Sequence, residues 1–247
     1  MNNLIALTSR EWKAFWYSPI AYVVGACFLL LQGFIFWLLL TALNDPLADP
    51  SWIISQAFFG TFFYWMIALA IPPLLTMRTL SEEKRTGTME VLLSAPVTDW
   101  QGVGAKFLGA WLAYGALWAM TIIYFLVLGR LTALDWGPIL TGYLGTMLLG
   151  GVFIAIGVLA SSLTRNQIIA AVLGFVLMLL VFATSFVGFF VTDPSSKRMI
   201  EYFSILDHVR DFARGIVDTR PLVCYASLIV IALFLAVRAI ASPRWRA

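Results

Sequence analysis

Six long runs without a charged residue divide this chain, and they constrain its fold more than any other feature. A helix needs about 20 consecutive apolar residues to cross the hydrocarbon core of a bilayer. Five of the runs exceed that length, and the sixth reaches it if the side chain of Arg238 extends towards the lipid headgroups. The runs are residues 14–44, 50–77, 107–129, 136–164, 166–192 and 221–237.

This pattern predicts an all-α integral membrane protein with six transmembrane helices. Of the 247 residues, 61% are hydrophobic and 12% are charged, whereas about a quarter of the residues of a soluble protein are charged. The weak alternation of apolar and polar residues that is typical of a membrane barrel is absent from the sequence. We expect a single membrane domain over residues 1–247, with transmembrane helices at 20–43, 53–77, 105–129, 137–163, 167–191 and 221–240.

The segment between the second and third runs is the most polar part of the chain. Residues 78–106 carry four basic and four acidic side chains around a short apolar stretch that ends at Pro96. An apolar helical turn in water on a membrane protein usually has a soluble partner that buries it. We therefore expect the loop at residues 78–104 to dock another protein.

Helix start and stop signals divide this loop into three parts. The second transmembrane helix is predicted to continue through residues 80–85 and to stop at Gly87, a natural residue for a left-handed helix end. Residues 88–95 then form a short amphipathic helix that Pro96 closes. Residues 98–101 fit a capping box that begins the third transmembrane helix. The apolar face of the short helix comprises Met89, Leu92 and Leu93.

The basic residues predict the side of the membrane on which each loop lies. With six spans, both termini lie on one side together with the 78–104 loop. That side carries ten Lys and Arg residues, and the other side carries six, of which five lie in residues 193–220 and are matched there by five acidic residues. The positive-inside rule then places both termini and the 78–104 loop in the cytoplasm.

Residues 1–18 precede the first span and have the two-faced pattern of a helix that lies in the membrane interface. A cleaved signal peptide is disfavoured, because the following apolar stretch is too long and no small-residue cleavage site closes it. Two roles stay open for this interfacial helix: a simple anchor, or an elbow that shares in docking the partner. Its apolar face comprises Leu4, Ile5, Trp12, Phe15 and Trp16.

Several kinds of chemistry lack the residues that would carry them. His208 is the single histidine of the sequence, which excludes a His-based metal cluster, and we expect it to be an interfacial polar residue. The sequence contains neither the P-loop motif of ATP-binding proteins nor the G-x-S-x-G motif of serine hydrolases. No ionisable residue lies deep within a span, which disfavours a proton- or ion-coupled carrier. Cys27 and Cys224 are expected to pack within their spans rather than to form a disulfide.

Small and polar residues within the spans favour helix packing over a substrate path. Glycines mark the fourth span, and such residues let helix backbones approach closely in lipid. The spans contain few polar residues, so these would line a substrate path only sparsely. Such an apolar lining suits a lipidic or amphiphilic substrate, or no substrate at all. These glycines are Gly142, Gly145, Gly150, Gly151 and Gly157. These polar residues are Gln32, Gln56, Tyr64, Thr121, Tyr143, Thr146 and Ser185.

Residues 193–220 are predicted to form an external helical segment before the last span. Apolar residues recur there at steps of three and four, as in an amphipathic helix or a broken pair of helices. Asp207 with Arg210, or Asp211 with Arg214, has the spacing of a surface ion pair on a helix.

Two stretches resemble a known family. Residues 82–97, EEKRTGTMEVLLSAPV, resemble the coupling segment of ABC-2-type transporter permeases. Residues 202–220 resemble the external segment of that family, most closely in its gliding-motility-type, GldF-like branch, although Val209 stands where that branch often has an aromatic residue. The coupling motif, E-x-x-x-G-T-x-E-x-L-x-x-x-P-V, falls on Glu83, Gly87, Thr88, Glu90, Leu92, Pro96 and Val97.

The resemblance implies an ABC-2, type V exporter-like fold and a permease subunit in the cytoplasmic (inner) membrane of a bacterium. In the family two permease subunits pair, either identical chains or a chain with a related subunit that carries an external domain. Each docks a separate ABC ATPase, which would bind ATP and Mg²⁺, so that we expect no cofactor on this chain and no enzyme activity of its own. Membrane lipid is a further expected partner, and nucleic acid is not. The implied docking residues are Glu82, Glu83, Arg85, Gly87, Thr88, Met89, Glu90, Leu92, Leu93 and Pro96.

The resemblance also implies that the external segment caps the pathway as an outer gate. The alternative is a lid that simply seats the fifth and sixth spans. The candidate gate residues are Phe203, Leu206, His208, Arg210, Phe212 and Arg214.

Two other functional classes stay open. A membrane scaffold could transmit an ATPase-driven change across the membrane without moving a solute, and its docking segment would look the same. A stand-alone six-span enzyme would need catalytic groups clustered at one membrane face, which residues 82–90 and 201–218 do not supply. If the docking interpretation holds, Glu83→Lys or Leu92→Asp should leave membrane insertion intact and uncouple the ATPase.

Overall fold

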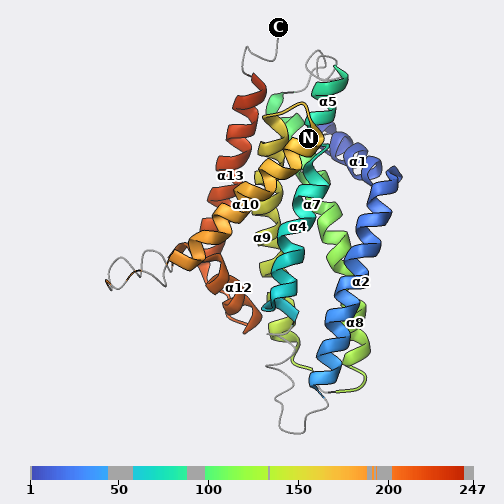
Figure 1. Cartoon of the computed structure of the whole chain (residues 1–247), viewed down its shortest axis with the longest axis vertical. Coiled ribbons are helices and arrows are strands. Elements are labelled where there is room, and N and C mark those ends of the chain that lie inside the picture. The colour runs from blue at the N-terminus through green and yellow to red at the C-terminus, as the bar shows by residue number, and fades with distance from the viewer. Residues whose placement is uncertain are drawn as a thin grey trace.

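The structure is a computed structural model that describes residues 2–43, 58–87, 98–132, 134–187, 191, 193 and 202–241. Every regular element in these residues is a helix, and the helices gather in one bundle (Figure 1). The helices are α1 (Asn2–Tyr17), α2 (Pro19–Ala42), α4 (Phe62–Thr76), α5 (Ser81–Thr86), α7 (Asp99–Met120), α8 (Ile122–Leu128), α9 (Trp136–Ser162), α10 (Gln167–Val187), α12 (Ile205–Ala213) and α13 (Thr219–Ala241).

Within the described residues, six helical stretches are long and apolar enough to cross a membrane. The predicted all-α, six-span architecture is therefore confirmed. Helix α1 and the end of α13 lie at the same end of the bundle as α5, whereas α12 lies in the opposite half (Figure 1). The six stretches are Pro19–Ala42, Phe62–Thr86, Asp99–Leu128, Trp136–Ser162, Gln167–Val187 and Thr219–Ala241.

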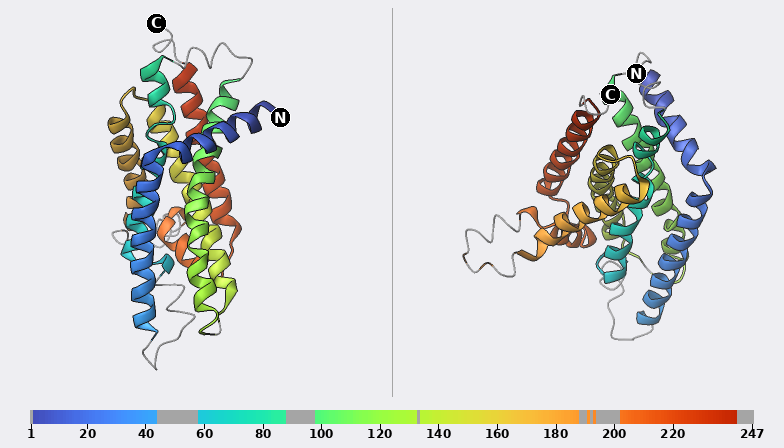
Figure 2. Two further views of the ribbon diagram at one scale, coloured as in Figure 1. Left: turned by 90° about the vertical axis from the view of Figure 1, so that its right-hand side faces the viewer. Right: turned by 45° about the horizontal axis from the view of Figure 1, so that its top comes forward.

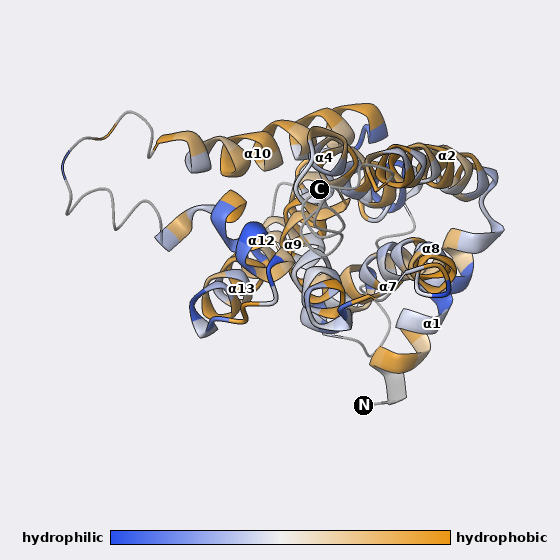
Figure 3. Cartoon of the chain, turned by 90° about the horizontal axis from the view of Figure 1, so that it is seen from below, coloured by the Kyte–Doolittle hydropathy of each residue, from blue (hydrophilic) through white to orange (hydrophobic). Residues whose placement is uncertain are grey.

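Helix α9 forms the centre of the bundle. Helices α4, α7, α10, α12 and α13 pack around it, and α2 lies at the periphery (Figures 1 and 2). The most apolar stretch of α9 is 78% buried, against 22% for those of α2 and α10. Figure 3 shows hydrophobic residues along α2 and α10, with hydrophilic residues gathered on α12 and at the start of α13. The exposed apolar faces of α2 and α10 are suited to lipid or to a second membrane subunit.

Glycines let the neighbouring elements approach α9 closely. A Cβ atom added at any of four glycines would lie within 3.0 Å of a side chain from another part of the chain. This confirms the prediction that the glycines serve tight packing within the membrane. The contacts are Gly142 with Phe59, Gly145 with Phe212, Gly150 with Tyr114, and Gly157 with Thr76.

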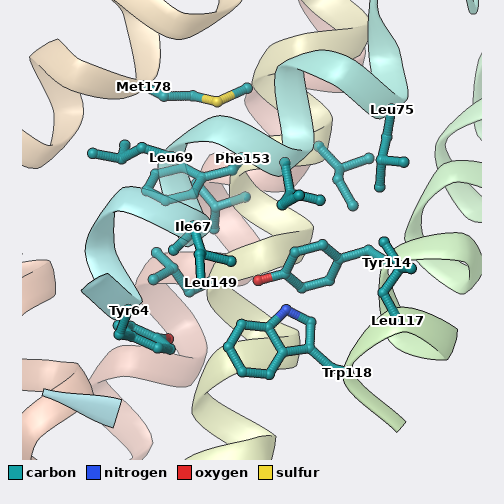
Figure 4. Packing of buried hydrophobic residues seen from close by; sticks show 14 of the residues in the cluster. Tyr64, Ile67, Leu69, Leu75, Tyr114, Leu117, Trp118, Leu149, Phe153 and Met178 are labelled. Atoms are coloured by element: carbon teal, nitrogen blue, oxygen red, sulfur yellow. The ribbon is translucent and has the colours of Figure 1, made fainter. Parts of the chain in front are cut away.

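Aromatic side chains fill the interior between α4, α7 and α9. Tyr64, Tyr114 and Trp118 are fully buried, and the last two project from α7 towards α4 and α9 (Figure 4). The hydroxyl of Tyr64 lies 3.1 Å from that of Thr146 on α9. A buried hydroxyl is costly unless it is hydrogen-bonded, so this pair stabilises the α4–α9 contact.

The other polar residues of the predicted lining are also internal. The hydroxyls of Thr121 and Tyr143 lie 2.6 Å apart, and that of Ser185 accepts a hydrogen bond of 3.3 Å from the backbone N–H of Leu206. Gln32 is wholly buried on α2, and Gln56 lies outside the described residues. Most of these groups thus bond within the chain rather than facing an open path.

The second span differs most from its predicted bounds. Helix α4 begins at Phe62, nine residues after the predicted start at residue 53, with Thr61 as its N-cap. It continues through Pro72 and Pro73 and ends at Thr76. A turn at residues 77–80 separates it from α5, whereas the sequence pattern predicted one continuous helix.

The third span begins earlier than predicted. Helix α7 starts at Asp99, before the transmembrane stretch predicted from residue 105. The predicted capping box forms at this start. The Gln101 N–H donates to the Thr98 hydroxyl, and the Thr98 N–H donates to the Gln101 side chain. Cys27 and Cys224 are both free, as expected, and Cys224 is buried, but Cys27 is exposed on α2 rather than packed within the chain.

Candidate functional site

Helix α5 is the described part of the segment that the sequence predicts to dock a partner. Its first turn is acidic, and its last turn carries Lys84 and Arg85, which suits the helix dipole. Gly87 ends the helix with φ 73°, a left-handed conformation that costs glycine little. The predicted helix stop at Gly87 is confirmed.

Two serines at the end of α9 hold α5 in place. The hydroxyl of Ser161 accepts hydrogen bonds from the backbone N–H groups of Leu80 and Ser81, at 3.1 and 3.0 Å. The buried ammonium of Lys84 donates to the backbone carbonyl of Ser162. Ser161 therefore bonds two of the N–H groups that a helix start leaves without a partner in its own helix. Helix α5 is thereby fixed to the central helix of the bundle.

A cluster of four charged side chains joins α5 to two further helices, and we call it the Lys106 hub. Lys106 of α7 lies 2.6 Å from the carboxylate of Glu83 on α5 and 3.3 Å from that of Glu11 on α1. Arg10 completes the hub, with its guanidinium 3.0 Å from Glu11 and 3.9 Å from Glu83. The hub links three elements that are far apart in the sequence.

Burial makes the Lys106 ammonium dependent on its two carboxylates. The side chain of Lys106 is 3% exposed, and an unpaired charge at such a position would be expensive. Two cations and two anions meet in the hub, so their formal charges cancel. The relative positions of α1, α5 and α7 are therefore set by directional ion pairs as well as by packing.

A close approach of α1 to α7 brings Glu11 within reach of Lys106. A Cβ atom added at Gly109 would lie 2.7 Å from the Cβ of Glu11, so any larger residue at position 109 of α7 would push α1 away. Helix α1 packs on the first half of α7 beside the start of α2 (Figure 2). It is therefore more than a free anchor, because it contributes an acidic residue beside the docking segment.

At the other half of the bundle, α12 packs by one apolar face. Ile205, Val209, Phe212 and Ala213 are buried, and Phe212 lies against Gly145 of α9. This confirms the predicted amphipathic helix. The hydroxyl of Thr141 on α9 donates to the Phe212 carbonyl at 2.6 Å. Helix α12 thus lies beside the first half of α9, against Thr141 and Gly145.

His208 also lies on the buried side of α12. Its ring meets the ring of Tyr225 on α13 edge to face, with the centroids 5.5 Å apart. Burial lowers the pKa of His208, and the charge of Asp211 opposes that shift. Asp207 and Asp218 oppose it more weakly. The imidazole is thus held mainly in its neutral form.

The comparison with protein families decides the class of this molecule. Residues 44–209 match the model of the ABC-2 family transporter proteins. The chain belongs to the ABC-2 transporter family. A comparison with curated proteins finds no match. As an ABC-2 protein with six apolar spans, the chain is a multi-pass transport subunit of the membrane rather than a catalytic enzyme, and permeases of this family generally work with an ABC ATPase subunit.

The structure places four of the predicted docking residues of this ABC-2 permease. Arg85 and Gly87 are exposed on the end of α5. Glu83 turns inward to the Lys106 hub, and Glu82 lies on the wall of a neighbouring cavity. The predicted docking residues that lie outside the described residues are Thr88, Met89, Glu90, Leu92, Leu93 and Pro96.

The predicted gate residues divide between the two faces of the external segment. His208 and Phe212 are buried. Phe203 is 55% exposed, and Arg214 is exposed. Arg210 is half-exposed and pairs with Asp207 at 3.8 Å, which is the first of the two predicted ion pairs.

The sequence did not predict which residues of the same chain contact α5. Glu11 had no predicted role, and Lys106 was expected only to be a charge of the loop. One signal could have pointed to them: Lys106 falls two turns inside a helix that starts at Asp99 and is followed by Gly109. A lysine on the membrane side of a helix start needs a carboxylate from another element. The serines at 161 and 162 gave no comparable signal.

Proposed function

We propose that this chain is the permease subunit of an ABC transporter in a bacterial cytoplasmic membrane, coupling ATP hydrolysis by a separate ATPase to export or to mechanical work. The observation that carries the proposal is the fixation of α5. Its side chains and the backbone at its start bond to α1, α7 and α9, immediately before the short helix predicted for residues 88–95. A force applied to the docking segment would therefore reach three helices at once.

The predicted docking residues suit a groove on an ATPase. On the short helix predicted for residues 88–95, Met89, Leu92 and Leu93 would offer an apolar ridge, and the exposed Arg85 precedes it in the chain as an orienting charge. In this proposal ATP and Mg²⁺ bind the ATPase, whose closure moves the short helix. A displacement of α5 would then pass to α1, α7 and α9 through its ion pairs and hydrogen bonds.

The distribution of basic residues supports the proposed orientation. Helix α5 lies at the same end as α1 and the end of α13, which is the side to which the sequence assigns ten of the sixteen basic residues. By the positive-inside rule, that end faces the cytoplasm. The docking segment and the ATPase then share one compartment.

A second permease subunit belongs to the proposal. Helices α2 and α10 leave most of their apolar stretches uncovered by this chain, so a further membrane subunit would find apolar surface on either. That subunit is either a second copy or a related chain with an external domain. The pattern of residues 202–220 supports a place in the gliding-motility-type branch.

Helix α12 is the proposed outer gate of this permease. It packs against the first half of α9, whereas α5 bonds to the end of α9. An apolar face and few hydrogen bonds hold it there. Phe203 and Arg210 face outward, where they could meet a substrate or a partner subunit.

A scaffold that transmits force without moving a solute is the second candidate. It is favoured by the internal pairing of polar groups, such as Tyr64 with Thr146 and Thr121 with Tyr143, which leaves few of the described polar residues to line a path. Both functions require the same ATPase.

Co-purification tests the shared core of the proposal. The tagged chain is purified from its native cells in mild detergent, and the retained proteins are identified and assayed for ATP hydrolysis. We expect a P-loop ATPase with the wild-type chain and its loss with Leu92→Asp. The matched control is Leu131→Asp, an exposed leucine outside the docking segment, which should retain the ATPase.

Either of two results would contradict the docking assignment. One is full retention of the ATPase by Leu92→Asp. The other is the absence of any ATPase from the wild-type preparation at good recovery, which would return the chain to the stand-alone alternatives.

A further inference from the structure

A cavity of about 430 Å³ lies beside the Lys106 hub, between α1, the start of α2, the end of α4, α5 and α7. One part of its wall is apolar and includes Phe15, Ile20 and Leu75. The other part is charged and includes Arg78 and Glu82. The cavity therefore offers an apolar surface and a charged surface to a single occupant.

Arg78 is a cation without an anion in the described part of the chain. One terminal nitrogen of its guanidinium donates to the Ser18 hydroxyl at 3.3 Å. Its Nε is buried and has no hydrogen-bond partner there. No carboxylate among the described residues lies within ion-pair distance of it. A buried N–H of this kind is expected to meet an acceptor that the chain itself does not provide.

The carboxylates on the same wall are also incompletely used. Glu82 forms no ion pair with a described residue, although it follows Arg78 by four positions. Glu83 uses one oxygen for Lys106, and its second oxygen, Oε2, is buried without a partner. Because the four charges of the hub balance each other, Arg78 and Glu82 are left as one positive and one negative charge facing the cavity.

The position of the cavity indicates which molecules can reach it. Ser18 and Ile20 lie where α1 passes into the first span, and Leu75 and Arg78 lie where the second span ends. This is the level at which lipid headgroups meet the hydrocarbon core. Leu74, also on the cavity wall, is 40% exposed on the outside of the bundle, so the apolar part opens towards lipid.

We propose that this cavity binds the headgroup of a zwitterionic phospholipid with a primary ammonium, of the phosphatidylethanolamine type. The phosphate would accept hydrogen bonds from the terminal nitrogens of the Arg78 guanidinium. The ammonium would donate to the carboxylate of Glu82. The glycerol and the first part of the acyl chains would follow the apolar wall past Leu74 into the bilayer.

Charge and hydrogen bonding select this lipid over the common alternatives. An anionic headgroup could place its phosphate against Arg78, but it has no ammonium to pair with Glu82, so its net negative charge would lie beside an unpaired carboxylate. A choline headgroup carries the same net charge as ethanolamine but has no N–H to donate to the carboxylates. The volume of about 430 Å³ lies within the range of roughly 300–1,000 Å³ typical of small-molecule pockets, so it suits a headgroup rather than a whole lipid.

The bound lipid would join the same elements as the hub. Arg78 belongs to the turn between α4 and α5, Ser18 joins α1 to α2, and Glu82 lies on α5. Occupancy would therefore stabilise the arrangement in which α5 is fixed against α1. The inference concerns lipid binding alone and does not depend on which protein docks at residues 88–97.

The test uses the full-length protein in nanodiscs that contain equal amounts of phosphatidylethanolamine and phosphatidylcholine with identical acyl chains. Native mass spectrometry then measures the lipids that remain bound as the nanodisc is removed. For the wild-type protein we expect one phosphatidylethanolamine to be retained about three- to tenfold more often than phosphatidylcholine, the net effect of about one hydrogen bond.

Two variants separate the two halves of the proposed site. Glu82→Gln should reduce the preference for ethanolamine over choline, while phospholipid is still retained. Arg78→Gln should reduce the retention of both lipids, because it removes the contact with the phosphate. Lys13→Gln is the matched control, since Lys13 is an exposed cation of α1 outside the cavity wall and should leave both values unchanged.

Equal retention of the two lipids by the wild-type protein would overturn the proposal, and this result requires no variant to fold. A preference for phosphatidylglycerol in a parallel nanodisc would also overturn it, in favour of an anionic lipid. An equal loss of retention in Lys13→Gln and Arg78→Gln would show that the lipid is held by general surface charge. Thermal unfolding of each variant checks that the protein remains folded.

Discussion

The two halves of the bundle hold their accessory helices by different forces. At one end, α1 and α5 are fixed by the Lys106 hub and by hydrogen bonds to Ser161 and Ser162. In the other half, α12 is held by a buried apolar face, with single hydrogen bonds from Thr141 and to Ser185. The ion pair of Arg210 with Asp207 on α12 is half-exposed.

This difference matters for how each helix can move. Ion pairs and charge-assisted hydrogen bonds depend on distance and direction, so they hold α1, α5 and α7 in one arrangement. Apolar packing is not directional, so it resists separation of α12 from α9 more than a small displacement along it. The α5 end is therefore suited to transmit a force, and α12 is suited to be displaced by one.

The largest expected effect comes from removing the buried cation of the hub. Lys106→Met should destabilise the protein by about 3 kcal/mol, because Glu11 and Glu83 would lose the buried one of their two cations and keep only the exposed Arg10. Thermal unfolding in detergent measures the change. The exposed Lys13→Met serves as the control and should stay close to wild type.

A double-mutant cycle sharpens this result. In Lys106→Met with Glu83→Gln, part of the lost stability should return, because Arg10 then faces one carboxylate instead of two. If Lys106→Met alone were as stable as Lys13→Met, the hub would contribute nothing and the comparison between the two halves would fail.

Packing should give the largest effect at α12. Gly145→Ala should cost about 1–3 kcal/mol, because its Cβ would lie 2.7 Å from the Phe212 ring. Gly174→Ala is the matched control, since the nearest atom to its Cβ would be 3.5 Å away. Phe212→Leu should restore part of the loss in Gly145→Ala, and a loss that is independent of Phe212 would contradict the packing account. Thermal unfolding reports both.

A smaller effect is expected from the protonation of His208. Burial lowers its pKa in the folded protein, so the unfolded chain binds the proton more readily. Stability from this group is therefore complete above the unfolded pKa of about 6.5 and is lost as the pH falls below it. The melting temperature of the wild-type protein should decrease more steeply between about pH 7 and pH 5 than that of His208→Phe. Parallel curves for the two proteins would show that His208 is not the source.

The smallest effect is expected at the surface of α12. Arg210→Gln should change the stability by less than about 0.5 kcal/mol, because Arg210 and Asp207 are half-exposed and 3.8 Å apart. A loss as large as that of Lys106→Met would show that charge also holds α12. The melting temperatures of the two variants, measured in the same detergent, give the comparison.

The fold could be predicted largely from the charge-free runs, because the backbone N–H and C=O groups of each span must form their hydrogen bonds within its own helix. The helix ends at Gly87 and Thr98 could be predicted for a similar reason, because local chemistry determines them. The break at residues 77–80 could not be predicted in this way. The backbone N–H groups of Leu80 and Ser81 there bond to Ser161, which is about 80 residues away in the sequence. Pairings between distant segments are not visible in local patterns.

The candidate site was predictable only in part for the same reason. The sequence identified Glu83 as a motif residue, but it predicted neither the inward turn of its carboxylate nor the role of Glu11. The amphipathic pattern of α12 was correct, because a stripe of apolar residues on a helix must be buried against something. Which of those residues would meet Gly145 depended on the packing of α12 against α9.

The most direct test of the account measures ATP hydrolysis by the permease–ATPase complex in lipid vesicles, with wild-type protein and Glu83→Gln. This variant keeps the shape of the side chain and weakens its link to Lys106. We predict that the ATPase still binds and that its rate of hydrolysis falls to that of the ATPase alone. A folded Glu83→Gln complex that hydrolyses ATP at the wild-type rate would contradict the claim that the hub couples the docking segment to the membrane helices.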